Sequence, residues 1–234
     1  VYDQIAIYKN KKEMEPLVVI KNGEFKREVI DEGIKNDKKY ICNRNIKVLH
    51  IKEDGSELKM WISPAMDTTL DVVWHPKSLF KTVTENVGYP TPTTMVGLQD
   101  AELINIVMLE NWYSSVDWQS TALNYLIEAN GYEVVFSHLH NVDIAGHTFW
   151  ELAKYRPHKE FYDEKLYQDV MERFYIDTDR YLGRFMHLLD EGWDIIITSD
   201  HGLVCAEEDE PAVPVGDPFG INVKVMQELG YTVL

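Results

Sequence analysis

Two Asp/His pairs in the second half of the sequence each follow an apolar run. Asp143 and His147 lie four positions apart in NVDIAGHTFW, and Asp200 and His201 are adjacent in IIITSDHG. A carboxylate beside an imidazole is a ligand set suited to zinc, manganese or iron. A single pair of this kind also occurs at helix caps and on protein surfaces. The repetition of the pair behind two apolar runs therefore indicates a metal site.

Two further histidines precede the Asp143/His147 pair. His138 and His140 lie at alternate positions, so they share one face if this part of the chain is an extended strand. We expect them to support the site or to pack in the core rather than to bind a metal ion themselves.

The elements that must position these residues alternate in the manner of an α/β fold. Segments 132–139 and 193–199 read as strands, the second as one that is buried on both faces of a parallel sheet. Mostly helical segments are expected over 102–131 and 162–192, and a helix followed by the start of a strand over 221–234. Consecutive strands of such a sheet point the same way, so both Asp/His pairs should converge at its carboxyl-terminal edge.

Local signals predict where the helices begin and end. The helical region before the first strand is expected in two pieces, with Asp117 as the cap of the second and Gly131 as its end. Gly192 is expected to end the long amphipathic helix that precedes the second strand.

The first part of the chain differs in kind. Short β-prone runs occur there, and the clearest signal is a hairpin around Asp54-Gly55, where alternating apolar residues flank a turn that needs a positive φ. Residues 63–100 are broken up by prolines and read as a connecting stretch. We therefore expect a β-rich, cap-like inserted segment over 1–95 and the C-terminal part of an α/β core over 96–234.

Composition limits the class of partner. The chain has 234 residues, of which 45% are hydrophobic, and a formal net charge of -16. The acidic excess argues against a nucleic acid or an anionic membrane as the main partner, and it suits an anionic small molecule that is met by bound cations. Cys42 and Cys205 lie far apart and predict no disulfide framework. The sequence has no apolar run of membrane-spanning length and no signal-peptide pattern.

The sequence HNVDIAGHTFW, a long helix and then IIITSDHG together resemble the alkaline phosphatase superfamily. The pattern is most similar to the type I phosphodiesterase/nucleotide pyrophosphatase branch and to a related group of predicted phosphohydrolases and phosphomutases. The resemblance covers roughly residues 100–234. It implies part of an alkaline-phosphatase-like parallel-sheet core that hydrolyses a small-molecule phosphate monoester or diester.

The resemblance also implies two divalent metal ions, zinc in preference to manganese. Asp143 and His147 would hold one ion, and Asp200 and His201 the other. The ions would activate a Thr or Ser nucleophile, and a covalent phospho-enzyme would then be hydrolysed.

Three parts implied by the resemblance have no clear match in the sequence. Lys21 stands where the first metal-binding Asp would be, and no histidine follows His201. Thr93 and Thr94 are the candidate nucleophiles within the chain, without an upstream Asp to support them. The chain also opens at Val1 without an initiator Met, so we expect a piece of a longer protein that lacks both ends of the site and is inactive by itself.

Two other functions remain open on the same residues. A phosphomutase of the same superfamily would keep the phosphoryl group for transfer instead of releasing it to water. A non-catalytic binding module would carry Asp/His pairs that no longer bind metal. The presence of an N-terminal Asp, a Thr or Ser nucleophile and a late His in the full-length protein would separate these functions from a hydrolase.

Overall fold

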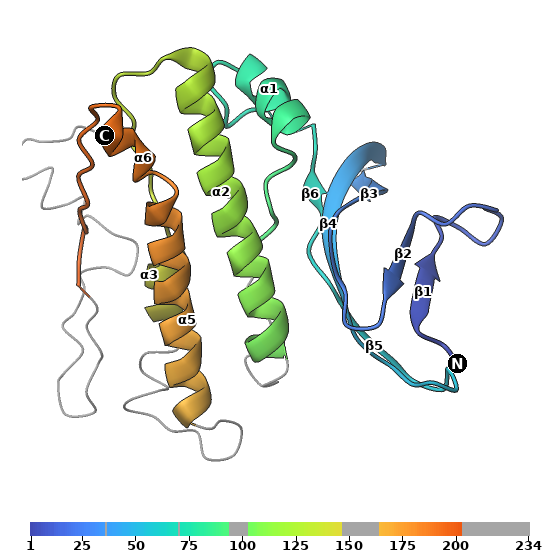
Figure 1. The fold of residues 1–234 in the computed structure, drawn as a ribbon. Coiled ribbons are helices and arrows are strands. Elements are labelled where there is room, and N and C mark those ends of the chain that lie inside the picture. Colours follow the sequence, from blue (N-terminus) through green and yellow to red (C-terminus); the bar gives the residue numbers. More distant parts are fainter. Residues whose placement is uncertain (36, 70, 94–102, 147–163, 203–234) are drawn as a thin grey trace, which may run out of the picture.

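A computed structural model describes residues 1–35, 37–69, 71–93, 103–146 and 164–202 of the chain. It shows antiparallel sheets at the N-terminal side, followed by a group of helices (Figure 1). The coarse prediction of a mixed α/β protein is therefore confirmed. No helix in these ranges has both the length and the apolar character that crossing a membrane requires.

The first part of the chain forms two antiparallel sheets. One pairs β1 (Gln4–Ile7) with β2 (Val18–Lys21). In the other, β4 (Lys38–Ile51) pairs with β3 (Phe25–Lys35), β5 (Leu58–Ile62) and β6 (Met66–Asp67). Their apolar faces share one buried cluster, which contains Ile20, Val29, Ile46, Val48 and Ile51. The β-rich part therefore has a small core of its own.

The hairpin predicted around Asp54-Gly55 is confirmed. β4 and β5 pair antiparallel with Val48 opposite Met60. Gly55 has a φ of 74°, a conformation that glycine enters without the steric cost of a Cβ. The Asp54 Oδ1 atom accepts a hydrogen bond of 2.9 Å from the backbone N–H of Ser56, which closes the turn.

One helix of this part was not expected. α1 (Ser78–Asn86) lies in the stretch that was interpreted as a connection, and it buries Val83 fully. The prolines were misleading because they flank the helix: Pro76 precedes its start and Pro90 follows its end. Proline is compatible with a helix boundary and disruptive only in the interior.

Two long helices dominate the second part. A π-helix, η1 (Leu103–Met108), leads into α2 (Leu109–Asn130), and α3 (Asn141–Ala145), α5 (Glu164–Gly183) and α6 (His187–Asp190) follow. α2 and α5 lie side by side in Figure 1, with the ring centroids of Trp112 and Phe174 6.0 Å apart. Both aromatic residues belong to the buried cluster that joins these helices.

α2 is continuous, so the predicted break with Asp117 as a cap is wrong. The Asp117 carboxylate instead accepts a hydrogen bond of 3.4 Å from Arg27 on β3 and another from Arg184, just beyond α5. Gly131 follows α2 with a φ of 62°, so this expected helix end is confirmed. The single long helix expected up to Gly192 is wrong. α5 ends at Gly183, and Gly192, with a φ of 87°, follows the separate short helix α6.

Buried polar contacts fix the β-rich part to α2. Asn45 Nδ2 donates to Asn111 Oδ1 at 3.0 Å, and both residues are 1% exposed. Lys47 Nζ donates to Glu110 Oε1 at 2.9 Å. In Figure 1 the sheets lie on the side of α2 opposite to α3. A cap-like role for residues 1–95 stays a prediction.

The parallel-sheet core is not confirmed. Segments 132–139 and 193–199 are not paired as strands, and every strand pair in the described residues is antiparallel. Ile196 and Ile197 are 84% and 70% exposed, so the prediction of burial on both faces is wrong here. An apolar run shows a preference for extended backbone, but the neighbours of a parallel strand come from distant parts of the chain. The helix and strand expected over 221–234 lie outside the described residues.

Both segments nevertheless pack against the helices with one of their two faces. Four side chains of the two segments pack against a buried cluster that comes from α2, α5 and the residues after α5. These four side chains are Val135, Leu139, Trp193 and Ile195. The intervening side chains face away from the helices, and Val134 and Phe136 are 87% and 91% exposed. In segment 132–139 this alternation is the period of a strand that lies on a helical layer. In segment 193–199 it ends at Ile195, because Ile196 and Ile197 are both exposed.

Candidate functional site

Asp143 lies on α3, a helix of 5 residues that is anchored to α5. Asn141 is 1% exposed, and its Nδ2 donates to the Phe174 carbonyl at 3.3 Å and to Thr178 Oγ1 at 3.0 Å. Ala145 is fully buried in the cluster between α2 and α5. A helix this short is not stable alone, so these tertiary contacts hold Asp143 in place.

Asp200 and His201 reach the same place at the end of the second extended segment. That segment starts where the Trp193 N–H donates to the Leu188 carbonyl at 3.0 Å. At its far end, His201 Nε2 lies 3.8 Å from Asp143 Oδ1 and 3.6 Å from Asp200 Oδ2. The structure therefore brings Asp143, Asp200 and His201 together from two distant parts of the sequence.

Two of the other candidate residues, His147 and Thr94, lie outside the described residues. Thr93 is exposed, and no hydrogen bond within the described ranges links it to the clustered side chains. Its neighbour Thr91 is held to α2, because its hydroxyl donates to the Ser114 carbonyl at 3.3 Å. A nucleophilic role for Thr93 or Thr94 stays a prediction.

Two imidazoles flank the carboxylate of Asp143. His140 Nε2 lies 2.7 Å from Asp143 Oδ2, while His201 faces the other oxygen. The rings of His138 and His140 are in contact, with centroids 4.8 Å apart, and both residues are exposed, so neither is a core residue. The alternating histidines before NVD were the sequence signal for this arrangement, but the sequence did not indicate which of them contacts Asp143.

The donor atoms fit a divalent metal ion in type and in pairwise spacing. Two ligand atoms bound to one tetrahedral ion at about 2.0–2.1 Å lie about 3.4 Å from each other. The distance within the Asp200/His201 pair, 3.6 Å from Nε2 to Oδ2, is close to that separation. The 3.8 Å from His201 Nε2 to Asp143 Oδ1 joins residues that the resemblance assigns to different ions. Both distances are too long for ordinary hydrogen bonds. In the part of the chain that is described, no group of three or more His, Cys, Asp or Glu side chains could hold a metal ion. The structure thus supplies pairs of donors rather than a closed site.

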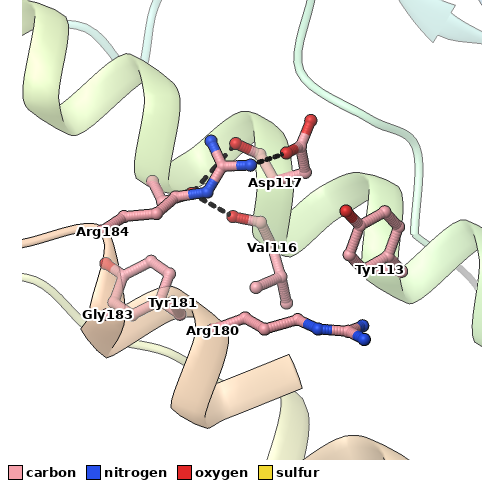
Figure 2. A pocket seen from close by; sticks show the side chains of 8 residues that line it. Tyr113, Val116, Asp117, Arg180, Tyr181, Gly183 and Arg184 are labelled. Carbon is pink, nitrogen blue, oxygen red and sulfur yellow. Dashed lines mark hydrogen bonds and ion pairs between the residues drawn. The ribbon is translucent and has the colours of Figure 1, made fainter. Parts of the chain in front are cut away.

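A separate hollow of about 220 Å³ lies between α2 and α5 (Figure 2). Arg180 and Arg184 line it, together with Asp117. Arg184 pairs with Asp117, and Arg180 pairs with Asp177 at 3.0 Å. Each guanidinium group is therefore paired with a carboxylate, although Arg184 shares Asp117 with Arg27. The clustered acidic and histidine residues do not line it.

The family model of type I phosphodiesterase / nucleotide pyrophosphatase matches residues 54–228, which is most of the chain. The chain belongs to this family. The match contains both Asp/His pairs, confirms the resemblance drawn from the motifs, and extends it from about residue 100 back into the β-rich part. Membership indicates hydrolysis of phosphoesters, with small molecules as substrates. Neither a curated protein nor a solved structure matches the chain.

Proposed function

We propose that Asp143, His147, Asp200 and His201 bind two divalent metal ions, zinc in preference to manganese, and that a phosphate monoester or diester is hydrolysed at this place. One observation carries the proposal: His201 lies 3.8 Å from Asp143 although the two residues belong to different segments. A site shared between two Asp/His pairs requires this convergence. Bound divalent ions would polarise a phosphoryl oxygen and neutralise charge on the phosphate and the leaving oxygen.

The charge of the chain supports a role for cations. The net charge is -16, and two carboxylates stand in the cluster itself. A phosphate anion would be repelled by Asp143 and Asp200 unless positive charge lay between them. The arginines of the α2/α5 hollow are paired with carboxylates, and the clustered residues do not line that hollow. Metal ions held by the Asp/His pairs would supply the missing positive charge.

The nucleophile is the second element of the proposal. It would be a Thr or Ser hydroxyl, for which Thr93 and Thr94 are the candidates within this chain. Each ion would receive two protein ligands from an Asp/His pair, whereas catalytic sites of this kind usually have three. We propose that this chain by itself binds metal weakly and does not turn over phosphoesters.

Metal binding by purified chain tests the first element. Zinc and manganese affinities are measured by titration calorimetry for the wild type, Asp143→Asn and His201→Asn. Loss of a ligand should lower the affinity by at least about 10-fold, the lower bound seen when only the support of a ligand is lost. Asp179→Asn on α5 and His187→Asn on α6 are matched controls, because both residues are exposed and lie outside the cluster. Equal affinities in all five proteins would contradict the proposed site.

Turnover tests the second element. The chain is assayed with an aryl phosphate and an aryl phosphodiester in the presence of zinc or manganese. Robust turnover that Asp200→Ala abolishes would show that the chain is catalytically complete, and would make Thr93 and Thr94 the first positions to substitute. A phosphomutase would instead transfer the phosphoryl group to a second substrate without releasing phosphate.

A further inference from the structure

The hollow between α2 and α5 carries more positive than negative charge. Arg180, Arg184 and the carboxylate of Asp117 line it. Asp117 is shared, because Arg27 Nη1 lies 3.4 Å from its Oδ2 atom and Arg184 contacts its Oδ1 atom. Arg180 pairs with Asp177, so three arginines face two carboxylates. Because the chain as a whole, with a net charge of -16, repels anions, this local excess singles out the hollow as a place where an anion can bind.

Both arginines are held in place, yet both keep N–H groups for a ligand. Arg184 Nη1 donates to Thr121 Oγ1 at 2.9 Å, in addition to its bond to the shared carboxylate. The guanidinium group of Arg180 lies 5.6 Å from the ring centroid of Tyr113 on α2, and it donates one bond to its own carboxylate partner. A guanidinium group has five N–H donors. Within the described ranges, most donors of both groups therefore have no protein acceptor.

The size and access of the hollow suit a small ligand. Its volume is about 220 Å³, whereas one water molecule takes about 30 Å³ in the liquid, so a tetrahedral oxyanion fits together with some of its water. The side chains of Arg180 and Arg184 are 60% and 41% exposed, which leaves the hollow open to solvent. In Figure 2 both extend from the α5 side toward α2, with Val116 between them. Guanidinium groups at such a distance from each other suit the oxygens of a phosphoryl group.

We infer that the α2/α5 hollow binds an oxyanion of the phosphate type, with Arg180 and Arg184 as its donors. Free inorganic phosphate and the phosphoryl group of a small molecule present the same oxygens, so both belong to this class. Asp117 stays paired with arginines when the anion binds, and its charge is therefore offset. The site is separate from the clustered acidic and histidine residues, which do not line the hollow, and it needs no metal ion.

Calorimetric titration of the full chain with inorganic phosphate, in the presence of a chelator, tests the inference. Arg180→Gln should raise the Kd at least about 10-fold, because a charge-assisted contact is lost. Arg180→Lys should bind with an intermediate Kd, since it keeps the charge without the fork of donors. Arg173→Gln is the matched control: it changes the net charge equally, but Arg173 is exposed on α5 and does not line the hollow. No saturable binding by the wild type, an unchanged Kd in Arg180→Gln, or an equal loss in Arg173→Gln would overturn the inference.

Nitrogen NMR locates the bound anion. Phosphate should shift the Nε–H signals of Arg180 and Arg184 but not that of Arg173, and shifts confined to other residues would mean an adventitious ion only and overturn the inference. Glycerol phosphate separates the two sources. Tighter binding of glycerol phosphate would support a phosphomonoester as the ligand, and tighter binding of inorganic phosphate would support the free ion. Because the chelator removes metal ions, failure of the proposed metal-dependent function leaves these outcomes unchanged.

Discussion

The β4–β5 hairpin and the segments 132–139 and 193–199 are all apolar runs with β character, yet only the hairpin is paired. The strands of the hairpin are joined by Asp54-Gly55, so each strand finds its partner within a few residues. The two extended segments have no such neighbour. They lie on α2 and α5 through alternate side chains and expose the others. Antiparallel pairing can thus be encoded by an adjacent turn, whereas a parallel strand depends on distant parts of the chain.

The largest effect is expected in the helical layer beneath the extended segments. Phe174 is 1% exposed and contacts Trp112, so Phe174→Ala should lower the free energy of unfolding by about 3–5 kcal/mol. Urea denaturation measures this change. Tyr175→Ala is the control, because the neighbouring Tyr175 is 56% exposed. Equal losses in the two variants would mean that α2 and α5 are not held together by the cluster that contains Phe174.

The junction between the two regions should show the next largest effect. Asn111→Ala leaves the buried amide of Asn45 and the Pro92 carbonyl without their partner, at a cost of about 1–3 kcal/mol. Asn45→Ala breaks the same bond from the other side. The double variant should therefore lose less stability than the two single variants together. Strict additivity in this cycle would show that the two asparagines do not interact.

Adjacent valines test the alternation of the first extended segment. Val135 packs against the helices, whereas Val134 is 87% exposed. Val135→Ala should cost about 1 kcal/mol for the partly buried methyl groups, and Val134→Ala should stay within about 0.5 kcal/mol of the wild type. Thermal or urea unfolding of both variants gives the comparison. A reversed order would mean that the opposite face of the segment lies on the helices.

The smallest effect concerns the pH dependence of α5. Burial raises the pKa of Asp177 above its ordinary value of 3.8, against the opposing effect of Arg180. The native state therefore holds this proton more tightly than the unfolded state. The stability contributed by the protonated carboxyl is complete below the ordinary value and is lost as the pH rises through the raised one.

Asp177→Asn should remove the loss of stability that ionisation of Asp177 causes. The stability of this variant relative to the wild type should therefore increase from pH 4 to pH 7, measured as the difference in urea midpoints. Asp179→Asn, an exposed neighbour on the same helix, should run parallel to the wild type. A constant difference between Asp177→Asn and the wild type over this range would contradict the effect of burial.

Features that depend on a few neighbouring residues could be predicted from the sequence. Asp54-Gly55 predicted the hairpin because a positive φ is a local requirement, and Gly131 predicted the end of α2 for the same reason. Gly192 also has a positive φ, but the long helix that it is expected to end stops at Gly183. The two Asp/His motifs predicted the family, which the match over residues 54–228 confirms. Proline and carboxylate signals were less reliable, because Pro76 precedes a helix and Asp117 pairs with Arg27 and Arg184 instead of capping one.

The arrangement of the candidate site depends on tertiary packing and could not be predicted from the sequence. Nothing in the sequence favours His140 over His138 as the residue that contacts Asp143, or predicts that His201 approaches the other oxygen of Asp143. These distances depend on Asn141 anchoring α3 to α5 and on one face of each extended segment lying on the helices. Such contacts join residues far apart in the chain. Local propensity and residue spacing do not predict these long-range contacts, because the contacts form only when the helices have packed.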